Sequence, residues 1–267
     1  MLPAPSADST ALVTGASSGL GVDLARSLAR RGHHVTLVAR REDRLTALAA
    51  ELTEAFGVGT AVIACDLGDA DARERLVTQI AAGGRRVDVL VNNAGYGSGA
   101  PFVDLDRESE VAMIRLNCEA VVDLCGRYAP AMAERGAGAI LNVASVVSFQ
   151  PVPRQATYSA SKAMVRTFSE ALHTELRGRG VTVTALCPGG MKTEFIEVAG
   201  VEAATADAPD FVFMAAADVA EQGIAALEAG RRVVVPGLVN RITSVAGTHS
   251  PHSVLLRVMD RFYPVGR

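Results

Sequence analysis

The sequence lacks the features that mark membrane-spanning, secreted and disulfide-rich proteins. No run approaches 18 consecutive apolar residues, and residues 1–9 lack the basic start and apolar core of a signal peptide. The cysteines form no C-x-x-C pair and lie in apolar segments, which favours buried free thiols over disulfides or zinc ligands: Cys65, Cys118, Cys125 and Cys187. We therefore expect a soluble cytoplasmic protein in which residues 1–9 are frayed.

A strong charge of either sign is also missing. The 267 residues carry a net charge of −3, which gives no broad attraction to nucleic acid or to an anionic membrane. The five histidines have no cysteine or carboxylate cluster beside them, so we assign no metal site. Small molecules are the expected partners, and a chain of this length should form one large core.

Strand-like and helix-like segments alternate along the chain. The expected strands are short apolar or β-branched runs at residues 10–13, 34–38, 61–64, 89–91, 139–143, 181–186 and 232–235. The expected helices have apolar residues at helical spacing over residues 20–31, 42–56, 70–81, 107–134, 158–178 and 219–229. This alternation predicts an α/β fold: a Rossmann-type doubly wound parallel sheet of about seven strands, with helices on both faces, as a single domain over residues 10–239.

The C-terminal part is less regular. Residues 188–217 show no clear period and are expected to form a substrate loop, after which Asp218 would cap the next helix. The tail, residues 240–267, has helical periodicity. Its apolar residues follow the spacing of an amphipathic helix: Leu255, Val258, Met259 and Phe262. We expect the tail to dock on its own or a neighbouring subunit, and attachment to a membrane surface is the less favoured alternative.

Glycines separate the first expected strand from the first expected helix. Gly15, Gly19 and Gly21 would let the backbone approach a pyrophosphate, and the helix amino terminus offers free N–H groups. After the second strand, an NAD-binding protein would use an acidic residue on the ribose 2′-hydroxyl, but here Arg40 and Arg41 follow. An arginine can clamp a 2′-phosphate, so we favour Arg40 as a phosphate contact and NADP(H) over NAD(H). A merely solvated arginine is the other interpretation.

A hydroxyl, a phenol and an ammonium lie close together near the middle of the chain. Ser145 follows a strand expected to be buried on both faces, and ligands bind at the carboxyl ends of such strands. Tyr158 and Lys162 are four residues apart in a helix, so they share one face. A nearby ammonium lowers the pKa of a phenol, which would let Tyr158 exchange a proton near neutrality. An ordinary exposed pair at this spacing is the alternative.

These segments resemble the classical short-chain dehydrogenase/reductase family over residues 10–235. The resemblance rests on the loop T-G-A-S-S-G-L-G at 14–21, on Asp66-Leu67, on N-N-A-G at 92–95 and on P-G-G-M-K-T at 188–193, in which Met191 departs from the usual valine. It implies a catalytic tetrad of Asn117, Ser145, Tyr158 and Lys162. The implied cofactor contacts are Arg40, Tyr158 and Lys162 together with Gly15, Ser17, Ser18, Gly19, Leu20, Asp66, Leu67, Asn93, Ala94, Gly95, Pro188, Gly189, Met191 and Thr193.

The family implies an NADP(H)-dependent oxidoreductase that interconverts a carbonyl compound and an alcohol by hydride transfer. Tyr158 would be the general acid or base, and Ser145 would orient the substrate oxygen. Lys162 would lower the pKa of Tyr158, hold the nicotinamide ribose and join a water relay with Asn117. The family also implies a homodimer or homotetramer, because the helices that carry Asn117 and Tyr158 are apolar on more than one face.

Two other functions are compatible with parts of the sequence. An extended epimerase or dehydratase shares Y-x-x-x-K, but its glycine spacing differs and it normally has a larger C-terminal region. A sensor or structural relative that binds NADP(H) without turnover stays open, since a fold does not imply an activity. An apolar carbonyl or alcohol substrate is favoured, because no arginine lies between Thr193 and Asp218 to clamp an anion. The expected loops supply apolar surface: Tyr96, Val146, Val147, Phe149, Met191, Phe195, Phe211, Phe213 and Met214.

Overall fold

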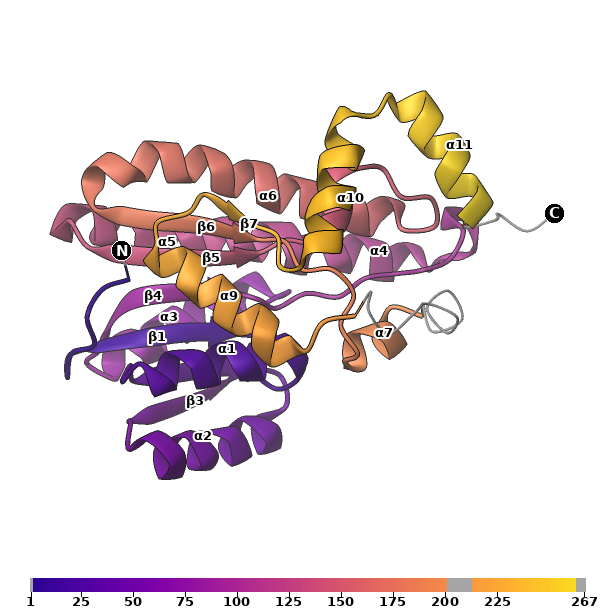
Figure 1. The fold of residues 1–267 in the computed structure, drawn as a ribbon. Coiled ribbons are helices and arrows are strands. Elements are labelled where there is room, and N and C mark those ends of the chain that lie inside the picture. Colours follow the sequence, from indigo (N-terminus) through magenta and orange to yellow (C-terminus); the bar gives the residue numbers. More distant parts are fainter. Residues whose placement is uncertain (1, 201–212, 263–267) are drawn as a thin grey trace.

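A parallel sheet forms the centre of the molecule (Figure 1). The computed structural model describes residues 2–200 and 213–262. Its strands run in the order β3-β2-β1-β4-β5-β6-β7, with every neighbouring pair parallel. This confirms the predicted doubly wound sheet. The bounds are β1 (Ser9–Thr14), β2 (Val35–Ala39), β3 (Thr60–Ala64), β4 (Arg86–Asn92), β5 (Gly138–Val143), β6 (Val181–Leu186) and β7 (Val233–Val234).

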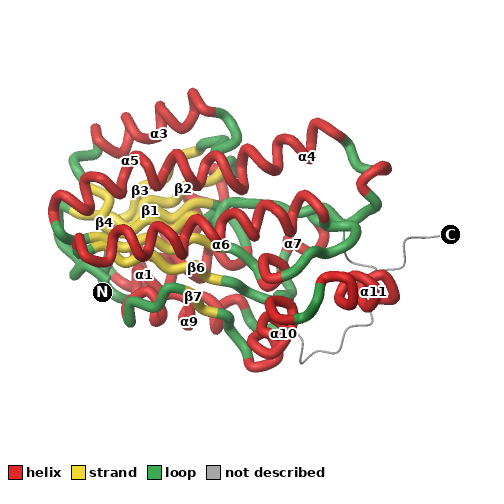
Figure 2. The backbone as a smooth tube through the Cα atoms, turned by 90° about the horizontal axis from the view of Figure 1, so that it is seen from above, coloured by secondary structure: helices red, strands yellow, loops and turns green. Residues whose placement is uncertain are grey.

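Helices cover both faces of the sheet (Figures 1 and 2). Side chains alternate along β1, so Ala11 and Val13 belong to one apolar core and Leu12 to the other. The first core includes residues of α1 (Gly19–Arg30), α2 (Glu42–Phe56) and α9 (Ala216–Glu228). The second includes residues of α3 (Ala70–Ala82), α5 (Ala120–Arg135) and α6 (Ala156–Leu176). The four cysteines are buried and free, as predicted.

Two expected features of the helices are wrong in detail. The helix predicted over residues 107–134 is α4 (Arg107–Ile114), a π-helical stretch η2 (Arg115–Glu119) and α5 in succession. Asp218 does not cap α9, because that helix already begins at Ala216 and leaves Asp218 in its first turn. A carboxylate in the first turn still interacts favourably with the helix dipole, which explains why the acidic residue indicated a helix start.

The predicted substrate loop and tail contain more helix than the sequence indicated. Helix α7 (Glu194–Val198) lies within the loop, while residues 201–212, including Phe211, lie outside the described residues. The tail forms α10 (Leu238–His249) and α11 (His252–Phe262), separated at Pro251, which cannot donate the next helical hydrogen bond. Met1 and residues 263–267 also lie outside the description. Short 3-10 turns complete the chain: η1 (Phe102–Asp104), η3 (Val146–Phe149) and η4 (Arg177–Arg179).

The described residues contain no helix long and apolar enough to cross a membrane. At the amino-terminal edge of the sheet, the backbone N–H of Arg86 donates to the carbonyl of Asp8, and Leu2 packs against the first core. Because all neighbouring strands are parallel, their carboxyl ends lie at the same edge of the sheet. Loops at this edge carry the polar residues that the sequence singled out.

Candidate active site

Ser145 and Tyr158 meet at the carboxyl end of β5. Ser145 lies two residues beyond the strand and begins η3, where its Oγ accepts a hydrogen bond from the N–H of Val147 at 3.4 Å. Tyr158 lies in the first turn of α6 and is only 7% exposed. The Ser145 hydroxyl lies close enough to Tyr158 to lower the pKa of its phenol, against the effect of burial. The chain between them thus brings a hydroxyl and a phenol to the same end of β5.

Lys162 lies one turn further along α6, and it is buried as well. Its Nζ donates to the carbonyl of Val143 at 2.9 Å and lies 5.9 Å from the centroid of the Tyr158 ring. The ammonium is therefore held by the end of β5, and the exposed-pair interpretation of these two residues is wrong.

Burial controls the titration of this pair. It raises the pKa of Tyr158 to about 12, although the hydrogen bond with Ser145 acts in the opposite direction. Burial also lowers the pKa of Lys162 to about 8. The sequence predicted that Lys162 would lower the pKa of Tyr158, and the structure shows the opposite direction. The reason is that desolvation of the phenol dominates while the ammonium is bonded to Val143.

Asn117 joins the site from η2. Its Nδ2 donates to the carbonyl of Tyr96 at 2.9 Å and to Oγ of Ser161 at 3.1 Å, and its Oδ1 accepts from the N–H of Tyr96 at 3.2 Å. A Cβ built on Gly95 would lie 2.8 Å from Asn117 Oδ1 and 3.3 Å from Lys162 Nζ. The absence of a side chain at Gly95 therefore leaves room for Asn117 and Lys162 to lie close together.

The glycine loop between β1 and α1 packs so closely against neighbouring backbone that side chains would not fit at two of its glycines. Gly15 has φ of +66°, and a Cβ there would lie 2.8 Å from Cα of Ala94. A Cβ on Gly21 would lie 2.2 Å from the carbonyl oxygen of Gly15. Ser18 precedes α1 and makes no side-chain capping hydrogen bond, so the first N–H groups of α1 can bind an anion. The loop fits a pyrophosphate.

Thr14 connects this loop to the N-N-A-G segment. Its Oγ1 donates to the carbonyl of Val91 at 3.1 Å and accepts from the N–H groups of Asn93 and Ala94 at 2.9 and 3.1 Å. In return, Nδ2 of Asn93 donates to the carbonyls of Thr14 and Gly15 at 3.0 and 3.2 Å. These contacts hold the two predicted cofactor-binding segments side by side.

The two arginines after β2 occupy different surroundings. Arg40 is exposed. Arg41 donates from Nε and Nη2 to Oγ of Ser17 at 3.2 and 3.1 Å, and from Nη1 to Glu194 at 3.0 Å. The sequence favoured Arg40 as the contact to the 2′-phosphate, but Arg41 is the arginine that contacts the glycine loop.

The segment after β3 is held by an arginine that the sequence did not single out. Asp66 Oδ1 accepts from the N–H of Gly68 at 2.9 Å, which shapes the predicted adenine-side turn. Arg73 is buried and donates to the carbonyl of Leu67 at 2.8 Å, and it also pairs with Glu119 of η2 and with Asp123. Its partners lie about 50 residues away in sequence, so no local pattern indicated this role.

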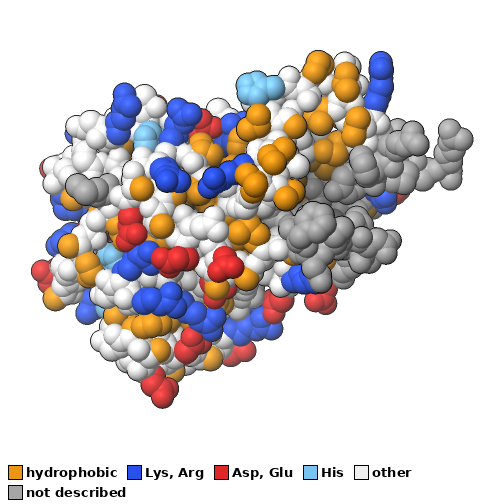
Figure 3. All heavy atoms as spheres, viewed as in Figure 1, with side chains coloured by type: hydrophobic (Ala, Val, Ile, Leu, Met, Phe, Trp, Pro, Cys, Tyr) orange, Lys and Arg blue, Asp and Glu red, His pale blue; other side chains and the backbone are white. Residues whose placement is uncertain are grey.

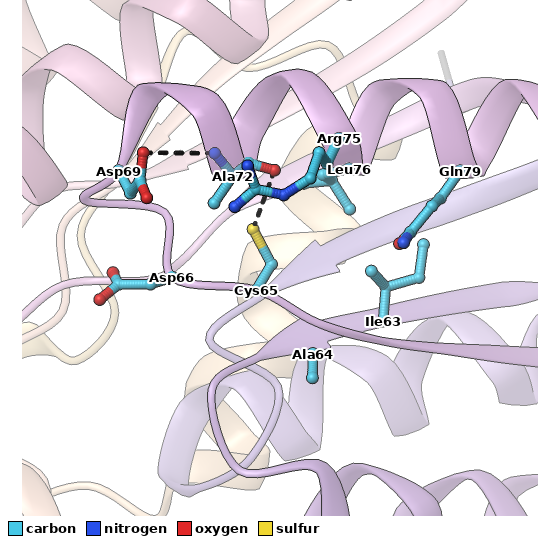
Figure 4. Close-up of a pocket in the computed structure, with 9 residues that line it drawn as sticks. All are labelled: Ile63, Ala64, Cys65, Asp66, Asp69, Ala72, Arg75, Leu76 and Gln79. Atoms are coloured by element: carbon cyan, nitrogen blue, oxygen red, sulfur yellow. Dashed lines mark hydrogen bonds between the residues drawn. The ribbon is translucent and has the colours of Figure 1, made fainter.

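A small pocket lies beside this turn, between β3 and α3 (Figure 4). Its volume is about 200 Å³, and Cys65, Asp66, Arg75 and Gln79 are among the side chains that line it. None of the four predicted catalytic residues lines it. It therefore adjoins the predicted adenine side rather than the site of the chemistry.

The P-G-G-M-K-T segment closes the site from β6. The carbonyl of Pro188 accepts from the N–H of Val146 at 2.9 Å, which places this segment against the Ser145 turn. A Cβ on Gly189 would lie 2.3 Å from Oδ1 of Asn240 in α10, so glycine here lets the Asn240 side chain pack against the segment. Met191 packs against the first core, and Thr193 approaches Gly19 of the glycine loop.

These segments now match a known family. A family model described as short chain dehydrogenase covers residues 9–202. The chain belongs to the short-chain dehydrogenase family. The family assignment agrees with the sheet order, the glycine loop and the clustered side chains.

Two curated relatives and one solved structure illustrate the similarity. A very-long-chain 3-oxoacyl-CoA reductase from Anas platyrhynchos is 38% identical over 73% of this chain, and the match spans 63% of that protein's length. Sulfoacetaldehyde reductase 2 from Chromohalobacter salexigens is 40% identical over 79% of this chain and 84% of its own. A short-chain dehydrogenase from Sphingobium yanoikuyae in complex with NADPH has a TM-score of 0.81 and 32% identity, over 93% of this chain and 95% of that one.

Proposed function

We propose that this short-chain dehydrogenase is an NADP(H)-dependent enzyme that interconverts a ketone or aldehyde and the corresponding alcohol. The observation that carries the proposal is the clustering of the buried side chains Lys162 and Asn117 around Gly95, with the Tyr158 ring centroid 5.9 Å from Lys162 Nζ. The similar fold of the NADPH complex from S. yanoikuyae supports the choice of cofactor.

Different segments around the site would bind different parts of the cofactor. The glycine loop and the amino terminus of α1 would hold the pyrophosphate, and Arg40 with Arg41 the 2′-phosphate. The Asp66 turn would contact the adenine, and segments 93–95 and 188–193 the nicotinamide end. When bound, the nicotinamide supplies or accepts the hydride.

The proton chemistry follows from burial. With its pKa raised to about 12, Tyr158 is a neutral phenol at neutral pH, which is the form that must donate a proton to a carbonyl oxygen during reduction. Ser145 would donate a hydrogen bond to the same oxygen and hold it in place. Lys162, charged below about pH 8, would hold the nicotinamide ribose, and Asn117 would link the site to solvent through water.

An apolar substrate is the better supported class. The Phe195 ring of α7 lies 5.5 Å from the Tyr158 ring, and a Cβ on Gly97 would touch both rings. An aromatic wall beside the proton donor favours an apolar group next to the reacting carbon. The similarity to a very-long-chain 3-oxoacyl-CoA reductase agrees with this, whereas the similarity to a sulfoacetaldehyde reductase favours a small anion.

The test is NADPH oxidation with bulky apolar ketones, aliphatic aldehydes and sulfoacetaldehyde, using Tyr158→Phe as the control variant. We expect turnover of the apolar ketones, and about a 10²-fold lower rate in the variant with NADPH binding retained. Efficient turnover of sulfoacetaldehyde with weak activity on apolar ketones would refute the substrate class. Near-normal turnover by Tyr158→Phe would refute the role of the tyrosine, and NADPH binding without oxidation of any compound would favour a sensor.

A further inference from the structure

Helix α7 links the catalytic tyrosine to the phosphate-binding loop through three successive residues. Thr193 caps the helix, and its Cβ lies 3.3 Å from the position that a Cβ on Gly19 would take. Phe195 lies against the Tyr158 ring. Glu194, between them, points to neither of these and instead contacts the arginines that follow β2.

Glu194 forms two ion pairs with those arginines. Its Oε2 accepts from Arg41 Nη1 at 3.0 Å, and its Oε1 accepts from Arg44 Nη1 at 2.5 Å. Hydrogen bonds from Arg44 and then Arg41 lower the pKa of Glu194 to about 2, so the carboxylate is charged at neutral pH. The same Arg41 guanidinium donates twice to Ser17 of the glycine loop.

We propose that Glu194 competes with the 2′-phosphate of NADP(H) for Arg41, so that phosphate binding releases α7 from the arginines. The inference rests on the proposed cofactor, because it needs the 2′-phosphate to bind beside Ser17 and Arg41. Glu194 occupies Nη1 of Arg41 while Nε and Nη2 face Ser17, so a 2′-phosphate bound there would share the guanidinium with the carboxylate, and the two anions repel each other. Glu194 is therefore a specificity residue that weakens NADP(H) binding and ties the 2′-phosphate to the position of Phe195 over Tyr158.

The expected effect is modest because these side chains are about two-fifths exposed. Breaking an exposed ion pair has a small effect, and we expect roughly a two- to five-fold change in affinity. The effect should shrink in high salt, because added ions screen exposed charges. Binding of a ligand without the 2′-phosphate should not change.

The experiment measures the dissociation constants of adenosine 2′,5′-bisphosphate and of 5′-AMP by calorimetry, with no chemistry involved. The variants are Glu194→Gln and the matched control Glu197→Gln, which changes another exposed carboxylate of α7. We expect Glu194→Gln to bind the bisphosphate about two- to five-fold more tightly and 5′-AMP unchanged, and Glu197→Gln to behave as the wild type. In hydrogen exchange, the bisphosphate should speed exchange of the α7 amides in the wild type, and Glu194→Gln should exchange fast without it.

Four outcomes would overturn the inference. They are weaker bisphosphate binding by Glu194→Gln, unchanged binding, an equal gain for 5′-AMP, and α7 exchange in the wild type that does not respond to the bisphosphate. If the wild type binds the bisphosphate and NADPH while Glu194→Gln changes nothing, only the role of Glu194 fails. If the wild type binds neither, the proposed cofactor fails with it.

Discussion

Tyr158 and Lys162 both titrate away from their ordinary pKa values because both side chains are buried. The free energy of desolvation disfavours the charged form of each group, which moves the phenol up and the amine down. The i, i+4 spacing in the sequence correctly indicated that they are neighbours. It could not indicate the direction of the phenol's shift, because that depends on how much solvent the surrounding chain removes.

These directions predict the pH dependence of reduction. The Lys162 ammonium is present below about pH 8 and is lost as the pH rises through that value, while Tyr158 stays protonated up to about 12. Because kcat/KM for NADPH reports groups of the free enzyme, it should be level below pH 8 and fall about tenfold per unit above it. Lys162→Arg keeps its charge and should move the fall beyond pH 10. A level profile to pH 10 in the wild type would contradict the assignment.

Arg40 and Arg41 allow a second test at the residue scale. A charge-assisted phosphate contact contributes about 1.5 to 3 kcal/mol, so Arg40→Ala should weaken NADPH binding roughly 10- to 100-fold and NADH binding far less. Fluorescence titration with both cofactors measures this difference. Equal losses for NADPH and NADH would show that Arg40 does not bind the phosphate. A selective loss found only in Arg41→Ala would assign the contact to Arg41, which already touches Ser17.

Residues with distant partners were beyond prediction from the sequence. The tetrad members and the glycine loop belong to short motifs with fixed spacing, and the structure places them together. Arg73 and Glu194 act through partners about 50 and 150 residues away. Their roles depend on which loops the sheet order brings side by side, and no local pattern carries that information.

At the scale of elements, η2 shows what periodicity misses. Apolar spacing over residues 107–134 predicted one helix, and only the structure shows the π-helical turn that carries Asn117. A π turn inserts one residue without changing the apolar pattern much, and such turns often occur at functional sites. The break at Pro251 is the converse case: proline is a residue that ends helices, and the structure has separate helices before and after it.

The packing of η2 against Gly95 yields a third prediction. In Gly95→Ala, the new Cβ would overlap Asn117 Oδ1 and crowd Lys162 Nζ, so both must shift. Because small misplacements of catalytic groups cost up to about 10²-fold in rate, turnover should fall at least tenfold while thermal stability changes little. Gly178→Ala is the matched control: Gly178 is exposed in η4, a Cβ there would meet nothing within 4 Å, and the variant should keep full activity. Full activity in Gly95→Ala would show that this contact does not position the tetrad.

At the scale of the whole molecule, the helices that carry the tetrad keep apolar surface. Exposed side chains from α4, α5 and α6, which lie near one another in Figure 2, include Val111, Ile114, Val122 and Met164. Burial of this face by a second subunit would explain why these helices are apolar on more than the face that the sheet covers. We predict a dimer or tetramer by light scattering, and a smaller species for Val122→Glu. Val103→Glu, in η1, is the control, and an unchanged oligomer in Val122→Glu would place the interface elsewhere.

The tail presents a second apolar surface, over α10 and α11 (Figure 3). The exposed residues are Leu238, Val239, Ile242, Val245, Val254, Leu256 and Val258. The opposite side of α10 packs against the site, where Asn240 adjoins Gly189 and Gly247 adjoins Gln150. Residues 238–259 contain no acidic residue, so the surface suits either an apolar subunit contact or an anionic lipid layer.

Truncation after residue 248 decides between these two occupants of the tail surface. Subunit docking predicts a smaller oligomer on sizing, or a lower turnover because α10, whose Asn240 adjoins Gly189, would lose the helix α11 that follows it. We expect this result, because Leu255 and Met259 are already partly buried in the single chain and leave fewer apolar side chains free for lipid. Membrane binding is measured by whether the full chain and the truncated chain sediment with vesicles of anionic phospholipid. An unchanged oligomer with full turnover that no longer sediments with the vesicles would show that the tail binds membranes instead.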